Sequence, residues 1–260
     1  MGYRWHLDCK GKLSTSPSLT SCIPSIYLSF AIAVVNRSVD LQKGFPFISN
    51  CGSYAPQSCI FSQVLNTGAA LAIWICIVRY HQLRDWGVKT WQNQLILWSG
   101  LLCALGTSIV GNFQEKNQKP THLVGAFLAF ILGNLYFWLQ FFLSWWTKGL
   151  PQPGPRWIRL LRLSFCSLST ILIVASILPR ALNWAKVPFL RVIILYSQRM
   201  RSASAACEWA VAMLLFVLFG FFAVDFSSLH GCTLHLEPQL DSSLPQTPTG
   251  SSNTPMSQML

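Results

Sequence analysis

The chain has 260 residues, of which 52% are hydrophobic and only 10% are charged. A soluble domain carries about 25% charged residues, so this composition excludes an ordinary water-soluble globular protein. The apolar residues fall in long runs, and a helix needs about 20 of them to cross a bilayer. We therefore predict an all-α, polytopic transmembrane helix bundle of six spans whose main partner is the lipid bilayer. The net charge of +11 lies in short patches between the runs, which the positive-inside rule explains without nucleic acid.

The N-terminal region gives the weakest evidence for a membrane span. Residues 1–22 form a polar segment without hydrophobic periodicity. The apolar run that follows, 23–35, has 13 residues and contains Pro24. It is short for a span and also fits a re-entrant or interfacial segment. Residues 36–58 are polar and rich in turn-forming glycine and proline, which predicts a loop.

Two features of this loop indicate the luminal side of the membrane. Asn36-Arg37-Ser38 is an N-glycosylation sequon, and we predict a glycan on Asn36. Cys51 and Cys59 are the close pair of cysteines within a polar loop. They are candidates for a disulfide, because disulfides persist in oxidising compartments.

Five further apolar runs predict the remaining spans, at 59–78, 94–110, 123–146, 163–178 and 209–226. The loops after the second and fourth runs carry the most Lys and Arg, which places both termini in the cytosol. The stretch 180–201 does not fit this topology, since it carries five basic residues on the predicted luminal side. Residues 227–260 contain no Lys or Arg and are rich in Ser, Pro and Thr, which predicts a disordered cytosolic tail.

Catalytic and metal-binding motifs are not apparent. The chain has no nucleophile elbow, P-loop, HExxH or CxxC motif, so we expect no enzymatic activity, no metal and no cofactor. Polar residues at membrane depth are more informative, because hydrocarbon makes them costly. We predict one polar cluster toward the luminal side, which serves either helix packing or a lipid headgroup pocket. Its members are Gln63, Asn66, Asn112, Gln114, His122 and Glu208.

A series of short motifs, in this order, resembles the damage-regulated autophagy modulator (DRAM) family, which includes the yeast Sfk-type proteins. The motifs are Phe45-Pro46-Phe47-Ile48-Ser49, Ser58-Cys59-Ile60-Phe61, Leu65-Asn66, Val78-Arg79-Tyr80, Asn112-Phe113-Gln114, His122 with Gly125-Ala126, and Glu208-Trp209. The resemblance covers about residues 30–176 and 200–230. The polar start of the chain and the stretch 180–198 depart from the family pattern.

The resemblance is closest to the branch of the family described as modulators of macroautophagy. It implies six spans, a location in plasma, endosomal, lysosomal and autophagosomal membranes, and promotion of autophagic flux and survival under nutrient stress. The Sfk-type branch implies an alternative, a plasma-membrane scaffold for phosphoinositide synthesis or lipid organisation. Anionic phospholipids would then be partners of the basic residues Arg79, Arg84, Lys89, Arg156, Arg159 and Arg162. A transporter is a third hypothesis, which no internal repeat supports. Partners among membrane proteins are not indicated by the sequence.

Overall fold

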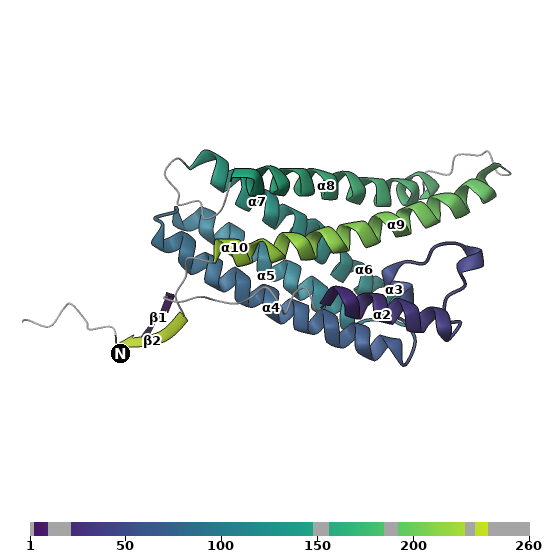
Figure 1. Cartoon of the computed structure of the whole chain (residues 1–260), viewed down its shortest axis with the longest axis horizontal. Coiled ribbons are helices and arrows are strands. Elements are labelled where there is room, and N and C mark those ends of the chain that lie inside the picture. The colour runs from purple at the N-terminus through teal and green to yellow at the C-terminus, as the bar shows by residue number, and fades with distance from the viewer. Residues whose placement is uncertain (1–2, 10–21, 148–155, 185–191, 227–231, 239–260) are drawn as a thin grey trace, which may run out of the picture.

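The computed structural model describes residues 3–9, 22–147, 156–184, 192–226 and 232–238. Within these ranges the helices form an elongated bundle, and five of them are long and apolar enough to cross a membrane (Figure 1). They are α4 (Gln57–Asp85), α5 (Thr90–Asn112), the continuous α6 (Lys119–Phe127), η2 (Leu128–Leu132) and α7 (Gly133–Trp146), α8 (Arg156–Trp184), and α9 (Val192–Gly220). The shorter apolar helix α2 (Cys22–Val35) lies beside them. The predicted membrane helix bundle of about six spans is thus confirmed.

The long helices run alternately up and down the bundle, which gives it two distinct ends. We call one the loop end, because it carries residues 36–56 and 113–118, and the other the tail end, where α10 (Phe222–Asp225) lies (Figure 1). At the tail end α4 stops where Gly87 takes a φ of 75°. Glycine tolerates this left-handed conformation, which lets the N–H of Val88 reach the Leu83 carbonyl at 3.1 Å.

The helices are longer than the apolar runs that predict them. Helix α9 has 29 residues, which corresponds to about 43 Å at 1.5 Å per residue and exceeds the roughly 30 Å hydrocarbon core. Residues 180–184 and 192–201 of the unexplained basic stretch therefore continue α8 and α9 at the loop end. A helix satisfies its own backbone hydrogen bonds in water as in lipid, so it extends beyond the apolar run and carries charged residues outside the hydrocarbon.

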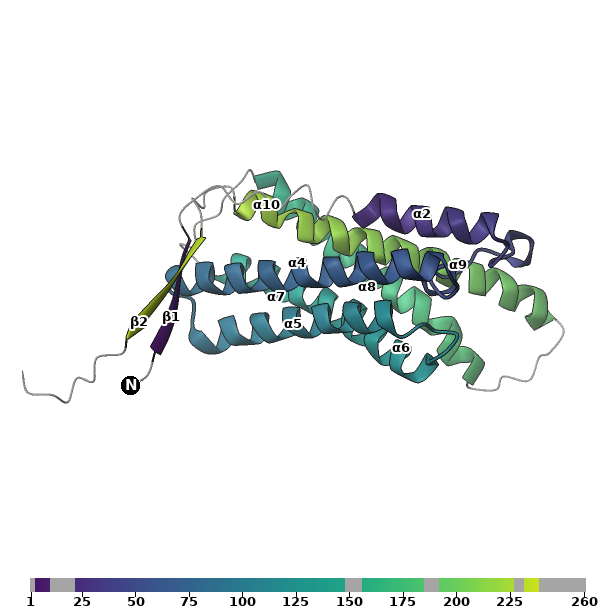
Figure 2. The ribbon, with the colours of Figure 1, turned by 90° about the horizontal axis from the view of Figure 1, so that it is seen from below.

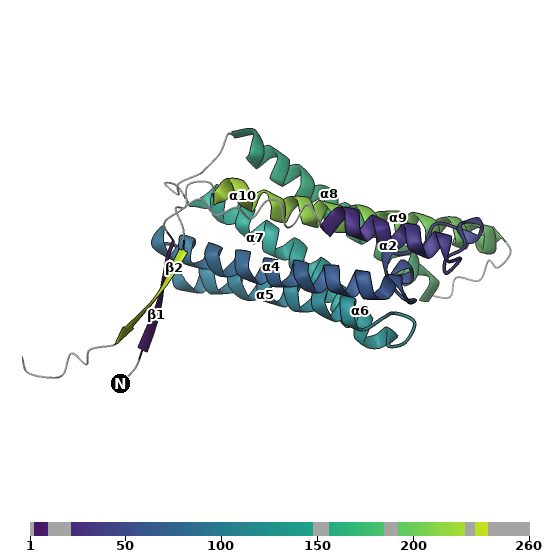
Figure 3. The same cartoon turned by 60° about the horizontal axis from the view of Figure 1, so that its bottom comes forward.

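The loop 36–58 packs against the bundle and contains two short helices, η1 (Leu41–Lys43) and α3 (Ile48–Cys51). The backbone N–H of Phe45 donates to Ser202 Oγ at 3.1 Å. The indole N–H of Trp209 donates to the Pro46 carbonyl at 3.1 Å. The Trp209 ring also stacks on Tyr27 of α2, with 5.6 Å between ring centroids. Loop, α2 and α9 therefore form one packed unit at the loop end (Figure 3).

Two strands outside the bundle were not predicted from the sequence. Strand β1 (Tyr3–Cys9) pairs antiparallel with β2 (Cys232–Pro238), with Cys9 opposite Cys232. Figure 2 shows the pair beside the tail end of the bundle. Residues 232–238 of the predicted tail form β2, while residues 227–231 and 239–260 lie outside the described ranges. Both strands alternate apolar and polar residues, and this period-two pattern is typical of strands. Over only seven residues the pattern is too short to stand out in the sequence.

Candidate functional site

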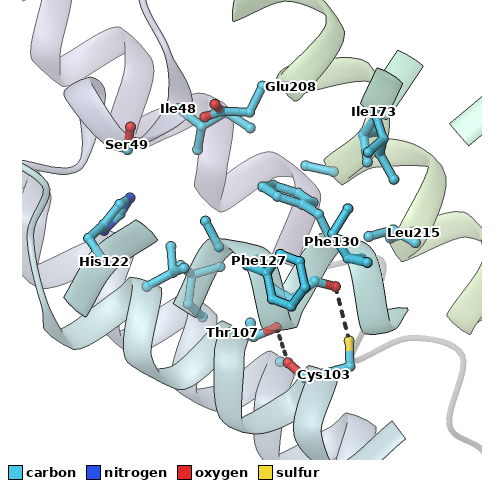
Figure 4. A pocket seen from close by; sticks show the side chains of 18 of the residues that line it. Ile48, Ser49, Cys103, Thr107, His122, Phe127, Phe130, Ile173, Glu208 and Leu215 are labelled. Atoms are coloured by element: carbon cyan, nitrogen blue, oxygen red, sulfur yellow. Dashed lines mark hydrogen bonds between the residues drawn. The ribbon is translucent and has the colours of Figure 1, made fainter. Parts of the chain in front are cut away.

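A cavity of about 280 Å³ lies in the half of the bundle nearest the loop end. Helices α2, α3, α4, α5, α6, η2, α8 and α9 all contribute to its walls. One end is apolar, where Phe130, Ile173 and Leu215 face each other (Figure 4). The other end carries polar side chains, among them His122 and Glu208. The cavity is thus amphipathic along its length, which is the general character of small-molecule sites in proteins.

Segments far apart in the sequence build the polar end. The hydroxyl of Ser49 on α3 donates to Oε2 of Glu115 at 2.7 Å, which ties the first loop to the loop between α5 and α6. His122 is only 4% exposed, and its Nδ1 lies 2.7 Å from the carbonyl of Phe113. Since a carbonyl oxygen only accepts hydrogen bonds, Nδ1 carries a proton and donates to Phe113; in the tautomer with the proton on Nδ1, Nε2 is an acceptor.

Glu208 lies opposite these groups, on α9. It also acts on Cys51 of α3, because burial and then the nearby Glu208 carboxylate raise the pKa of that thiol to about 12. Cys51 is 2% exposed and therefore remains a neutral thiol at physiological pH. The Glu208 carboxylate therefore lies close enough to α3 to affect Cys51, and α3 also carries Ser49, the partner of Glu115.

An irregular turn and close helix packing shape the middle of the cavity. The five residues of η2 form a π-helix, a wide turn that often occurs at functional sites, and Ala129 and Phe130 from this turn line the cavity. Helix α5 approaches it closely. A Cβ on Gly106 would lie 2.5 Å from the backbone nitrogen of Ala129, and one on Gly125 would lie 2.6 Å from a methyl carbon of Ile109. Only glycine permits these distances.

The predicted polar cluster divides into separate groups. His122 and Glu208 both line the cavity. Asn66 and Asn112 form a reciprocal amide pair between α4 and α5, with Nδ2–Oδ1 distances of 2.9 and 3.1 Å. Ser108 Oγ donates to the same Asn66 oxygen at 2.7 Å. This pair belongs to helix packing, the less specific of the two interpretations.

The remaining two members of the predicted cluster lie apart from the cavity. Gln63 is exposed on α4. Gln114 lies in the loop after α5, where its Oε1 accepts a hydrogen bond from Asn117 Nδ2 at 2.6 Å. Sequence spacing places all six residues near one end of the bundle, but only tertiary packing decides which of them face each other. Ser49 and Glu115 of the polar end were not predicted, because they lie 66 positions apart in loops.

The structure also shows where the predicted glycosylation residue and the predicted disulfide cysteines of the loop lie. Asn36 is exposed, in the turn that directly follows α2. Cys51 and Cys59 are both free thiols, the first buried and the second exposed. The structure therefore does not join them: Cys51 packs inward with Phe61 in the hydrophobic cluster at the loop end.

A second polar network, at the tail end, was not foreseen. Arg79 Nε donates to Gln140 Oε1 at 3.1 Å, and Arg79 Nη1 donates to Gln82 Oε1 at 2.6 Å. Gln82 Nε2 in turn donates to the backbone carbonyl of Asp225 at 3.1 Å. The Asp225 carboxylate accepts from Arg162 Nη2 at 2.8 Å. Four separate helices, α4, α7, α8 and α10, are held together by this network.

The tail-end network corrects the expected position of Arg79. It was assigned to a basic cytosolic loop, but it lies within α4 and is 7% exposed. Its guanidinium group packs over the Trp86 ring, 5.1 Å from the centroid. A second cavity, beside Arg79, Arg159 and Arg162, measures about 20 Å³. This is room for about one water molecule and excludes a phosphoinositide headgroup at that point.

The sequence profile described as "Frag1/DRAM/Sfk1/Cwh43P N-terminal domain" matches residues 18–229, which include the cavity and the tail-end network. The chain belongs to this family. Among the Frag1/DRAM/Sfk1 proteins, Modulator of macroautophagy TMEM150B of Mus musculus is 76% identical over 238 residues, 92% of this chain and 93% of that protein. The Homo sapiens protein of the same name is 65% identical over 230 residues, 88% of this chain and 91% of that protein.

A more distant Frag1/DRAM/Sfk1 relative has a different name. Transmembrane protein 150A of Xenopus laevis is 30% identical over 263 residues, 91% of this chain and 92% of that protein. No solved structure matches the chain. The family resemblance drawn from the short motifs, and its closest branch, are therefore confirmed.

Proposed function

We propose that this chain is a multi-pass membrane regulator of macroautophagy that promotes autophagic flux and supports cell survival under nutrient stress. One observation carries the proposal: relatives named as modulators of macroautophagy match it over nearly their whole length, at 76% identity for the mouse protein. The similarity thus extends over the membrane bundle and both of its polar sites. Plasma, endosomal, lysosomal and autophagosomal membranes are the proposed locations.

The test is a measurement of autophagic flux in cultured cells. The chain is overexpressed, or its endogenous counterpart is depleted, with and without a block of lysosomal degradation. We expect overexpression to increase the lipidated autophagosome marker, with a further increase under the block. Depletion should lower the marker, and re-expression should restore it. Unchanged flux in both directions would refute the proposal.

The proposed orientation places both termini in the cytosol and the loop end in the lumen. Asn36 supports it, because this sequon residue is exposed beside the end of α2. The test compares the gel mobility of the wild type and Asn36→Gln, each with and without a glycan-removing enzyme. A mobility shift on glycan removal is expected in the wild type only, whereas equal mobility of the untreated wild type and Asn36→Gln would refute a luminal glycan on Asn36.

The alternative, a scaffold for phosphoinositide synthesis, has less support from the basic residues. Arg79 and Arg162 are engaged inside the bundle with Gln140 and Asp225. Arg84 pairs with its neighbour Asp85 at 3.1 Å. Normal recovery of plasma-membrane phosphoinositides after depletion of the protein would set this alternative aside.

A further inference from the structure

The charged groups that line the loop-end cavity have one sign. Glu115 and Glu208 line it, and no Lys or Arg does so among the residues that the structure describes. Opposed like charges are strongly unfavourable in a water-poor site. The anionic headgroup of a phospholipid is therefore a poor occupant, and a cationic head is a favourable one.

The polar end also presents hydrogen-bond acceptors. The proton of His122 is held on Nδ1 by the Phe113 carbonyl, and Nε2 makes no hydrogen bond with any described residue. The buried ring faces the cavity (Figure 4). One oxygen of Glu115 accepts from Ser49, which leaves the other for a further donor. Such a group of acceptors matches a ligand with several N–H donors.

The size of the cavity limits what it encloses. An engineered cavity of about 150 Å³ holds one benzene molecule, so a cavity of about 280 Å³ holds about a dozen non-hydrogen atoms. This is enough for a polar head and the upper part of an alkyl chain. The apolar end, with Phe130 and Leu215, provides the surface for that chain.

The cavity wall between α6 and α8 is also the outer surface of the bundle. Phe127 of α6 and Ile177 of α8 both line the cavity, yet their exposed fractions are 58% and 47%. An opening bordered by exposed apolar side chains at membrane depth faces lipid. A ligand therefore reaches the cavity from the bilayer, and a longer chain leaves through the same opening.

We infer that this cavity binds a membrane amphiphile whose head carries a protonated primary amine. The ammonium group supplies a positive charge and three N–H donors, which match Nε2 of His122 and the carboxylate of Glu115 at the polar end. A hydroxyl head supplies one donor and no charge, and a carboxylate head supplies repulsion. Occupancy would connect α6, which carries His122, to the loop between α5 and α6 that carries Glu115 and to its partner Ser49 on α3.

The first test needs no mutation and is separate from the autophagy assay. The full chain, purified in a nonionic detergent, is incubated with dodecylamine, dodecanol or dodecanoate, which share one chain and differ in the head. Retained ligand is counted by native mass spectrometry. We expect dodecylamine to bind at least about tenfold more tightly than the other two, as for a hydrogen bond to a charged group. Equal retention of dodecanol or dodecanoate would refute an amine site.

Three variants locate the binding site. Glu115→Gln keeps the acceptor for Ser49 but removes the charge, and we expect it to weaken dodecylamine binding about tenfold. Ala126→Phe fills the cavity without changing charge and is expected to abolish binding. The matched control, Asp85→Asn, removes a carboxylate that is exposed at the opposite end of α4 and should leave binding unchanged. A loss in Asp85→Asn equal to that in Glu115→Gln would show non-specific attraction and overturn the inference.

Discussion

Replacing Asp225 with asparagine tests whether the tail-end network holds the bundle together. The Asp225 side chain is 3% exposed and its partner Arg162 is 24% exposed, with 2.8 Å between the charged atoms. Removing one partner of a buried pair costs about 3–5 kcal/mol. Because Arg162 retains some access to solvent, we expect a loss near the lower bound, about 3 kcal/mol. Arg79 keeps its connection through Gln82 to the Asp225 backbone carbonyl, but the negative charge near it is removed.

The assay is unfolding of the purified protein in mixed micelles with increasing denaturing detergent, followed by tryptophan fluorescence. The control is Asp85→Asn, because Asp85 and Arg84 are 56% and 36% exposed and such pairs contribute less than about 1 kcal/mol. Adding Arg162→Gln to Asp225→Asn should recover part of the loss, since Arg162 then no longer leaves an unpaired charge, while Arg79 remains charged. Equal losses in Asp225→Asn and Asp85→Asn would refute the structural role of the network.

Three further predictions concern the loop-end half. Gly106→Ala should destabilise the bundle by about 1–3 kcal/mol through overpacking, whereas Gly220→Ala, with open space around it, should be neutral in the same unfolding assay. Asn66→Ala should cost about 0.6–1.7 kcal/mol, the range for interhelical hydrogen bonds in membranes, and an unchanged midpoint would contradict the amide pair. At about pH 8, iodoacetamide should modify exposed Cys59 and spare Cys51 by peptide mass spectrometry, because a pKa of about 12 keeps Cys51 protonated and unreactive. Equal modification would show that the loop is open.

The existence and type of the main helices were predictable from the sequence, because an apolar run long enough to span a bilayer has few other stable conformations. Helix ends were not. The basic stretch 180–201 did not fit the predicted topology, but the helices continue through 184 and begin again at 192. Charge ends the membrane segment without ending the helix, since the backbone hydrogen bonds do not depend on the side chains.

The candidate site was predictable only in part. His122 and Glu208 were found because polar residues beside apolar runs are costly and therefore informative. Ser49 and Glu115 were missed, because their hydrogen bond depends on how two loops fold over the bundle. Arg79 was misplaced for a related reason: its charge suggested a loop, while its partners on other helices are invisible in the local sequence.

The π-helix η2 has a consequence for the phase of the helix that contains it. Each residue of an α-helix turns the chain by about 100°, and a π turn accommodates one additional residue. Converting η2 to α geometry at constant length would therefore rotate α7 by about 100° and turn Asn134 away from Thr170, 2.9 Å away. Deleting one residue within 128–132 would instead leave the azimuth of α7 unchanged. This turn is thus the point where the helix tolerates a change in length. It lets α6 and α7 each keep their own packing against neighbouring helices.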